Sequence, residues 1–220
     1  MSRKIYFISG LGANEQVFTR LQLTDVVPVY LKWIIPQKNE LIQNYAKRML
    51  QQIDEPNPVL LGLSFGGMIA VEMAKQYPVQ HIILVSSVKT RNELPWWMKA
   101  AGKLKLHKII KTKPNPVLYP VEDFFLGAVS DEEKKLVTQF RQNVDDVYLE
   151  WAINVIVNWN NVTIPENITH IHGITDKIFP IGNIQADYNI SGGGHFMVYN
   201  KAEDVSRFIN SVLKKYPGVK

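Results

Sequence analysis

The sequence predicts an α/β fold, with a mostly parallel central sheet, helices on both of its faces and a helical insertion. Short apolar runs without alternation recur at residues 5–8, 59–63 and 81–86. Strands that are hydrophobic on both faces belong to parallel sheets covered by helices. Stretches with helical periodicity lie between these runs, and alternation of strand and helix defines the α/β class. Residues 90–165 break the alternation, because they show helical periodicity and no clear strand.

The length fits one domain with an inserted segment. A chain of 220 residues with 46% hydrophobic and 20% charged residues is typical of a globular protein. We expect residues 1–89 and 166–220 to form the core of the domain, and residues 90–165 to form a helical cap inserted between two strands.

The first half of the chain starts with a strand and a glycine-containing turn. Ile5–Ile8 is a buried strand that ends in the turn Ser9-Gly10-Leu11-Gly12. Asn39 is expected to cap a helix whose apolar residues keep the helical period at Ile42, Tyr45, Ala46, Met49 and Ile53. A strand at 59–63 and a helix at 66–76 follow.

The second half supplies the remaining strands and the insertion. Strands are expected at 81–86, 168–172 and 185–190. Within the insertion, Ser130 and Glu133 have the spacing of a capping box, followed by one helical run of apolar residues at 136, 137, 140, 144, 147, 148 and 151. Asn200 and Glu203 have the same spacing and are expected to start the last helix.

Composition excludes several classes of protein. The absence of cysteine removes disulfides, thiol nucleophiles and thiolate metal sites. The net charge of +5 comes from one lysine-rich segment, residues 99–113. We interpret this segment as the solvent-exposed face of a helix, and the alternative is that it attracts an anionic substrate or surface. Aromatic and basic residues do not interleave as they do in binders of single-stranded nucleic acid. We expect no nucleic-acid partner and no metal or cofactor.

The N-terminal residues indicate the cellular compartment of the protein. The apolar run after Lys4 is too short for the core of a signal peptide, and no stretch approaches a membrane span. A cytoplasmic protein is therefore expected. The sequence does not indicate an oligomeric state.

The strongest chemical signal is the pentapeptide Gly62-Leu63-Ser64-Phe65-Gly66, between a buried strand and a helix. This G-x-S-x-G pattern places a serine on a sharp, strained turn that lifts its hydroxyl above the sheet. Side chains two residues before and after the serine would collide there, so glycine is needed at both positions. Ser64 is therefore the candidate nucleophile.

A serine hydroxyl needs a base, and the base needs a carboxylate that fixes its tautomer. Among the histidines, His195 follows the glycine-rich run 191–194 after the last expected strand, where open α/β sheets place ligands. Asp176 follows the strand at 168–172, whereas its rival Asp187 lies within the last strand. Ser64, Asp176 and His195 then occur in the chain order expected for this architecture.

These motifs together resemble the α/β-hydrolase fold superfamily, and within it the small esterases with a helical cap. The similarity rests on segments 9–12, 62–66, 172–176 with Pro180, and 194–196, and it covers nearly the whole chain. The chain departs from the family in having Ser9-Gly10 where His-Gly is frequent, and in starting directly at the strand that carries this turn. The similarity implies an oxyanion hole formed by the backbone N–H groups of Leu11 and Phe65.

The expected substrate is a small neutral or mildly anionic apolar acyl ester. Binding pockets are mostly apolar, and large apolar residues gather in the insertion and beside the histidine. The candidate pocket residues are Trp96, Trp97, Phe124, Phe125, Trp151, Phe196 and Met197. The sequence thus predicts a carboxylesterase that works through an acyl-enzyme.

The sequence is also compatible with other functions. A thioesterase, a carbon–carbon hydrolase, an acyltransferase or a lyase would use the same three residues, and a non-catalytic receptor would use the fold and its pocket. A dinucleotide-binding protein is excluded, because Glu15 stands where a G-x-G-x-x-G turn after Gly10 and Gly12 needs glycine or alanine.

Overall fold

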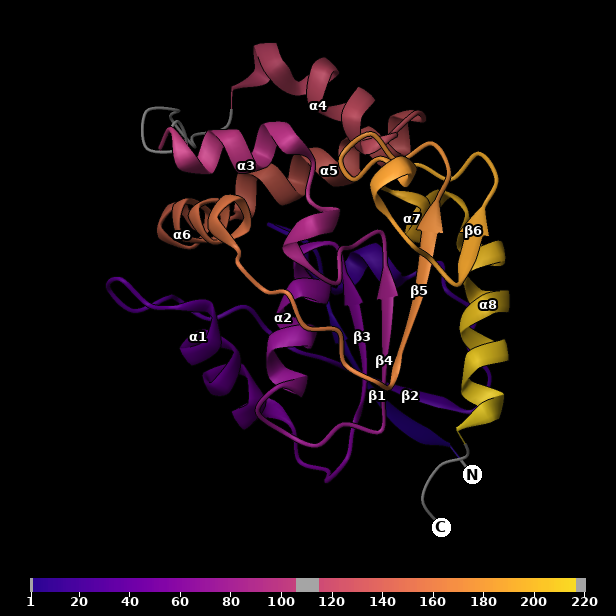
Figure 1. The fold of residues 1–220 in the computed structure, drawn as a ribbon. Coiled ribbons are helices and arrows are strands. Elements are labelled where there is room, and N and C mark those ends of the chain that lie inside the picture. The colour runs from indigo at the N-terminus through magenta and orange to yellow at the C-terminus, as the bar shows by residue number, and fades with distance from the viewer. Residues whose placement is uncertain (1, 106–114, 217–220) are drawn as a thin grey trace.

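A computed structural model describes residues 2–105 and 115–216 (Figure 1). His107 and the lysines at 108, 111 and 113 of the basic segment lie outside the described residues. The strands are β1 Arg3–Ile8, β2 Val26–Tyr30, β3 Val59–Leu63, β4 His81–Val85, β5 Ile168–Gly173 and β6 Tyr188–Ile190. The helices are α1 Ile42–Met49, α2 Phe65–Ala74, α3 Trp96–Lys103, α4 Tyr119–Leu126, α5 Asp131–Asn143, α6 Asp146–Asn158, α7 Met197–Asn200 and α8 Ala202–Lys215. Short 3₁₀ helices are η1 Glu15–Phe18, η2 Leu50–Gln52, η3 Arg91–Glu93, η5 Pro116–Leu118 and η6 Ile181–Asn183.

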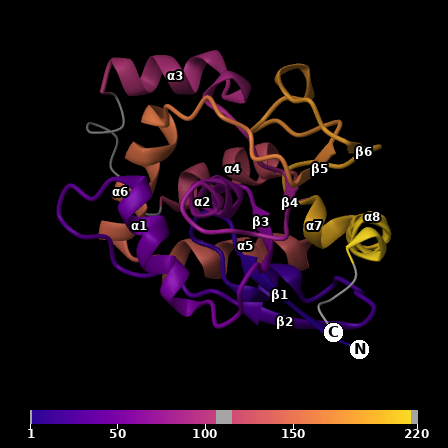
Figure 2. The same ribbon diagram turned by 60° about the horizontal axis from the view of Figure 1, so that its bottom comes forward.

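The central sheet has six strands in the order β2-β1-β3-β4-β5-β6, and every neighbouring pair is parallel. Alternate residues of its buried strands enter two separate cores. Tyr6, Leu60 and Leu84 face α1 and α2, whereas Phe7, Leu61 and Val85 face α7 and α8. The sheet is therefore covered on both faces, which confirms the predicted α/β class (Figure 2).

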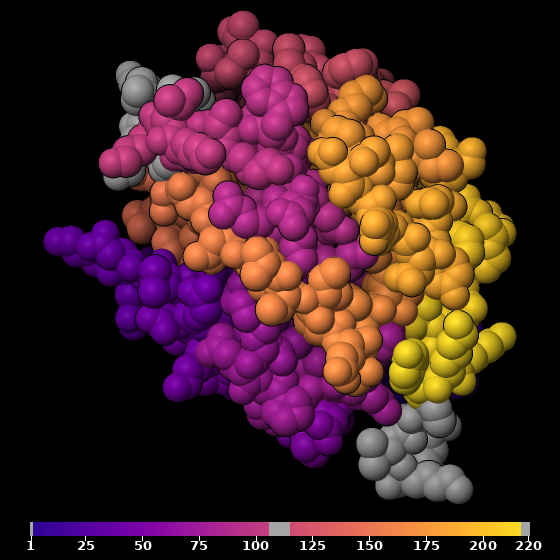
Figure 3. All heavy atoms as spheres, viewed as in Figure 1, coloured from indigo at the N-terminus to yellow at the C-terminus, as the bar shows by residue number. Residues whose placement is uncertain are grey.

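The helices α3, α4, α5 and α6 all lie between β4 and β5 in the chain. Figure 1 shows them gathered beyond the tips of the strand arrows, at the carboxyl end of the sheet. In the space-filling view, α3 and α4 are visible at the upper end of the molecule (Figure 3). No strand occurs in this insertion within the residues that the structure describes.

Three helix starts differ from those expected. α1 has Leu41, not Asn39, as its N-cap, because Asn39 adopts a left-handed backbone with a φ of 57°. α8 starts after Lys201, and the Asn200 side chain instead donates to the Gly127 carbonyl. The expected single helical run of the insertion is interrupted at Val144, where the Asp145 side chain caps α6 by accepting from Tyr148 N–H.

The predicted cap at Ser130 is present in part. Its Oγ accepts a hydrogen bond from the Glu133 N–H at 3.3 Å. The Glu133 carboxylate, however, accepts from the N–H of Val129 at 2.7 Å, one residue before the position that a capping box requires. The start of α5 at Asp131 is thus stabilised by the side chains of Ser130 and Glu133, which accept from two different N–H groups.

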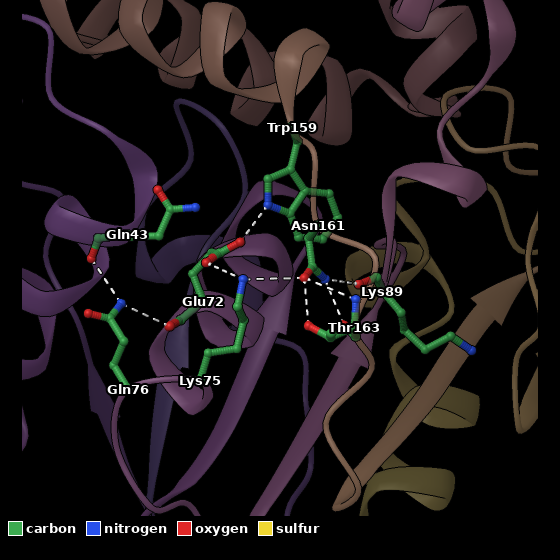
Figure 4. Close-up of polar contacts among 8 residues, drawn as sticks. All are labelled: Gln43, Glu72, Lys75, Gln76, Lys89, Trp159, Asn161 and Thr163. Atoms are coloured by element: carbon green, nitrogen blue, oxygen red, sulfur yellow. Dashed lines mark hydrogen bonds and ion pairs between the residues drawn. The ribbon is translucent and has the colours of Figure 1, made fainter.

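The end of the insertion is fastened to α2 by a buried carboxylate (Figure 4). Glu72 of α2 is fully buried, and its Oε1 accepts from Trp159 Nε1 at 2.8 Å. Lys75 Nζ lies 2.9 Å from Glu72 Oε2 and 3.3 Å from Asn161 Oδ1. Asn161 in turn donates to the Lys89 carbonyl beyond β4. The chain returning from α6 is therefore tied to the core before β5 begins.

Replacing Trp159 with phenylalanine should lower the free energy of unfolding by about 2–3 kcal/mol. The change removes a donor from a buried carboxylate, and hydrogen bonds to charged groups contribute more than neutral ones. Urea unfolding measures the effect. The matched control is Trp96→Phe, because Trp96 is 77% exposed and should change stability by less than about 0.5 kcal/mol. Equal effects at the two positions would contradict the anchoring role.

Candidate active site

Ser64 stands between β3 and α2 on a turn that other residues would not tolerate. Its φ is 52° and its ψ is −120°, a strained backbone for a residue other than glycine. A Cβ at Gly62 would lie 2.5 Å from Gly67 Cα, and a Cβ at Gly66 would lie 2.3 Å from the carbonyl oxygens of Ile8 and Ser9. The two flanking glycines are thus required by close backbone approach, as the sequence predicts.

Neighbouring strands support this turn. The Ser64 N–H donates to Val85 O at 3.0 Å, at the end of β4. The Ser87 hydroxyl donates to the Ser64 carbonyl at 2.7 Å. The strained serine is therefore held from both sides by backbone and side-chain hydrogen bonds.

The structure brings Ser64, His195 and Asp176 together. His195 Nε2 lies 2.9 Å from Ser64 Oγ, and His195 Nδ1 lies 2.8 Å from Asp176 Oδ2. Both distances are within hydrogen-bonding range. Since a carboxylate only accepts, Nδ1 carries the proton and Nε2 faces the serine hydroxyl with its lone pair.

Two loops position the histidine and the aspartate. Asp176 follows β5 and His195 follows β6. The Thr175 N–H and hydroxyl both donate to Gly193 O at 2.9 Å, and a Cβ at Gly173 would lie 2.2 Å from that same oxygen. Close packing of the two loops therefore requires glycine at 173 and sets the His195–Asp176 distance.

The Asp176 carboxylate is buried and held in place by further donors. Its Oδ1 accepts from the N–H groups of Ile178 at 2.8 Å and Phe179 at 2.9 Å. Burial acts to raise the pKa of Asp176, but the charge and hydrogen bond of His195, with help from His172, lower it below its ordinary value. The rival Asp187 accepts from the His170 N–H instead.

His170 and His172 form a second, buried pair behind Asp176. His172 Nε2 donates to the Phe179 carbonyl at 2.8 Å, so its Nδ1 accepts from His170 Nε2 at 3.2 Å. Burial lowers the pKa of both imidazoles, which are therefore neutral. The 3.6 Å approach of His172 Nε2 to Asp176 Oδ2 is then a contact between a neutral ring and a carboxylate. The sequence indicated only partial burial for this pair, whereas both side chains are fully buried.

Acidification from pH 7 to 5 should lower the free energy of unfolding steeply. His170 and His172 have lowered native pKa values, and burial lowers the pKa of His81 to about 4. The unfolded chain binds protons near pH 6.5, so stability is full above that pH and falls below it, by up to about 1.4 kcal/mol per pH unit for each histidine. Urea unfolding across this range measures the slope.

A variant separates this effect from general acid sensitivity. His81→Gln removes one of the three titrating rings and should make the pH slope shallower by roughly a third. A stability that stays flat between pH 7 and 5 would contradict the assignment of neutral buried histidines.

A pocket of ≈ 380 Å³ lies beside the turn after β1. Its walls are residues 12–15, residues 32–35 after β2, and Phe140, residues 143–145 and Tyr148 at the corner between α5 and α6. The turn formed by residues 9–12 lies between this pocket and the serine. At one end of the turn, a Cβ at Gly10 would lie 3.4 Å from Ser64 Cβ, and at the other end a Cβ at Gly12 would lie 3.5 Å from Val144 of the pocket wall.

The seven apolar residues expected to line a substrate pocket are not part of this pocket. Trp96, Trp97, Phe124 and Phe125 are between 41% and 77% exposed. Trp151 packs on Tyr45 with ring centroids 4.2 Å apart and donates to Glu40 O. Phe196 and Met197 are buried in the core that faces α8. None of the seven lines the pocket described above.

Sequence reasoning missed Trp33 and Tyr148 at this pocket. Trp33 follows β2, and its position after an apolar run at the carboxyl edge of the sheet is the signal that could have identified it. The sequence pattern identifies Tyr148 only as one of the apolar residues with helical spacing in the insertion. The ring centroids of Tyr148 and Trp33 lie 5.1 Å apart, and Trp33 also stacks on Phe65 with a centroid distance of 5.5 Å.

The described residues contain no helix with both the length and the apolar character needed to cross a membrane. The two residues expected to supply oxyanion donors lie after neighbouring strands, since Leu11 follows β1 and Phe65 follows Ser64 at the end of β3. Among the described residues, no backbone hydrogen bond engages either N–H group.

Comparison with known proteins gives matches by structure only. No protein-family model matches the sequence, and no curated protein matches it. An esterase from Thermogutta terrifontis superposes with a TM-score of 0.71 at 13% identity, covering 98% of this chain and 90% of that one. An esterase from Exiguobacterium antarcticum and a bromoperoxidase from Bacillus anthracis give the same TM-score at 15% and 14% identity, each covering 97% of this chain and 92% of its own.

At such low identity, the likeness establishes the architecture and leaves the activity to be argued from the site. The six-stranded parallel sheet, the strained serine after β3 and the helices inserted after β4 all agree with it. The chain therefore has the α/β-hydrolase fold.

Proposed function

We propose that the protein is a serine hydrolase, and that it cleaves carboxylic esters through an acyl-enzyme. The observation that carries the proposal is the hydrogen-bonded series Ser64 Oγ, His195 and Asp176, with distances of 2.9 Å and 2.8 Å, on a serine with a φ of 52°. Such a series converts a weakly nucleophilic hydroxyl into an attacking group.

In the proposed mechanism, His195 acts first as a base and then as an acid in each half-reaction. Ser64 Oγ attacks the ester carbonyl carbon while His195 Nε2 takes its proton. The N–H groups of Leu11 and Phe65 stabilise the negative oxygen of the tetrahedral intermediate. His195 then protonates the departing alcohol. In the second half-reaction, water attacks the acyl-enzyme carbonyl while His195 takes its proton, and His195 returns that proton to Ser64 Oγ as the acid is released. Asp176 holds the ring tautomer and stabilises the imidazolium, with its own orientation fixed by the N–H groups of Ile178 and Phe179.

The segment at 90–165 is proposed as a cap over this site. Its helices α3 to α6 lie at the carboxyl end of the sheet, the same end as Ser64 (Figure 1). A location in the cytoplasm, expected from the sequence, stays a prediction.

Covalent labelling by a fluorophosphonate tests the proposal. The reagent requires an activated serine, so the wild-type protein should be labelled at Ser64 and the Ser64→Ala protein should not be. Unlabelled wild-type and Ser64→Ala proteins should be assayed in parallel on short and long acyl esters and on thioesters. Labelling without ester turnover would favour another acyl-transfer reaction on the same residues. Absence of labelling would favour a non-catalytic receptor and overturn the proposal.

A further inference from the structure

We propose that the pocket beside Gly12 binds an uncharged part of the substrate, and that Tyr148 donates a hydrogen bond to a neutral oxygen in it. This inference rests on the proposed function and names the substrate class: neutral esters whose chain carries one hydrogen-bond-accepting oxygen away from the reacting carbonyl. Its volume of ≈ 380 Å³ is within the range of small-molecule sites.

The Tyr148 hydroxyl is the unsatisfied group that points to a ligand. The residue is only 3% exposed, and its buried Oη has no acceptor to which it can donate; the neighbouring Gly12 N–H is itself a donor and leaves the O–H proton unused. A buried hydroxyl that lacks a partner destabilises a fold, so such groups are rare and often functional. Burial raises the pKa of Tyr148 well above its ordinary value, and the phenol therefore keeps its proton and acts as a donor.

Several other polar groups of the pocket wall already have partners. Asn14 Oδ1 accepts from the Gln16 N–H, and Asp145 Oδ1 accepts from the Tyr148 N–H. Lys32 Nζ lies 2.8 Å from Glu15 Oε2. Among the buried side-chain atoms of the wall that the structure describes, the Tyr148 hydroxyl is the one that lacks an acceptor, and it is therefore the donor available to a ligand.

The rest of the wall determines the charge of the ligand. The wall contains two carboxylates, Glu15 and Asp145, against one ammonium group, Lys32, and that cation is paired. The remaining surface is apolar and aromatic, with Trp33, Ile34, Phe140 and Val144. A carboxylate in the substrate would meet net negative charge, so the sequence-based expectation of a neutral or mildly anionic ester narrows to a neutral one.

The pocket is near enough to Ser64 for one substrate to reach both. Gly10 approaches Ser64, and Gly12, two residues later, forms part of the pocket wall. Two residues of extended chain span at most about 7 Å. Between them stands Leu11, whose N–H is the proposed oxyanion donor. A chain that leaves the ester carbonyl along this turn therefore arrives at Tyr148.

The test compares substrates and variants in a cycle. The substrates are an aryl hexanoate, its analogues in which one chain methylene is replaced by oxygen, and the half ester of a dicarboxylic acid of equal length. For the wild type, kcat/KM for the best oxygen-containing ester relative to the hexanoate should be about five- to tenfold higher than the same ratio for Tyr148→Phe, which is the value of one hydrogen bond. The half ester should be the poorest substrate.

A matched variant and a stability measurement complete the test. Tyr6→Phe makes the same change at a buried tyrosine whose hydroxyl is bonded to Asp54, and it should leave the substrate ratio unchanged. Tyr148→Phe should lower Tm little, because the hydroxyl has no acceptor to lose. An unchanged substrate ratio in Tyr148→Phe, a preference for the half ester, or a Tm several degrees lower would each overturn the inference.

Binding to an inactive protein separates this inference from the proposed function. Calorimetry on Ser64→Ala should detect hexanamide analogues with a chain oxygen, and binding should weaken about five- to tenfold when Tyr148→Phe is added. If no ester is cleaved but this difference appears, the proposed function fails and the subsite stands. If esters are cleaved and neither assay depends on Tyr148, the subsite fails alone.

Discussion

Replacing Ser64 with alanine should lower kcat for any ester substrate by on the order of a million-fold, which is the cost of removing the nucleophile from a serine triad. The hydroxyl lies 2.9 Å from His195 Nε2, and no other hydroxyl occupies that position among the described residues. Steady-state kinetics on the best substrate from the ester screen measures the loss. Urea unfolding should show that the variant remains folded, since alanine removes only one oxygen.

Ser87→Ala is the matched control for that experiment. Ser87 also lies at the carboxyl end of the sheet, but its hydroxyl donates to the Ser64 carbonyl and does not face His195. Its loss should cost stability, about 1 kcal/mol for one hydrogen bond, and far less activity than the loss of Ser64. Comparable activity losses in the two variants would show that support of the turn, and not the Ser64 hydroxyl, determines the rate.

Asp176→Asn should lower kcat roughly ten-thousand-fold. Asparagine keeps the shape of the side chain but presents an N–H₂ group to His195 Nδ1, 2.8 Å away in the native protein. The ring is then driven toward the tautomer with its proton on Nε2, which cannot accept from Ser64. Single-turnover kinetics measures the acylation step directly.

The comparison variant for Asp176 is Asp187→Asn. Asp187 is the neighbouring carboxylate and accepts from the His170 N–H at 2.8 Å, away from His195. It should retain activity within about tenfold, because a backbone contact is weakened and no reacting group is lost. If Asp187→Asn were the more damaging variant, the role assigned to Asp176 would be wrong.

The sequence predicted the parts of the structure that depend on local chemistry. The strain at Ser64 requires Gly62 and Gly66, and this requirement appears directly as G-x-S-x-G. Strands β3 and β4 were recognisable because they are apolar at nearly every residue, as is typical of strands buried on both faces. The order of Ser64, Asp176 and His195 followed from the positions of loops after strands.

The parts that depend on packing between distant segments could not be predicted in the same way. Tyr148 and Trp33 are far apart in sequence and meet only because the first turn of α6 packs against the segment that follows β2. Their composition does not distinguish a pocket wall from a core, since aromatic residues dominate both. The helix starts at Asn39 and Asn200 failed for a related reason: a capping side chain can bond elsewhere, and Asn200 reaches Gly127 in the insertion.

The pairing of β4 with β5 across the long insertion has a consequence for how this protein can change. Ile82 pairs with Ile168 although residues 86–167 intervene. The entropy of closing a loop grows only with the logarithm of its length, so doubling such a segment costs about 0.6 kcal/mol. Glu72 and Lys75 bind the insertion at its end, through Trp159 and Asn161. The helices between β4 and Trp159 can therefore be lengthened, shortened or exchanged with little loss of stability. The wall that contains Tyr148 can therefore diverge faster than the frame that holds Ser64, and substrate preference can evolve while the reaction stays the same.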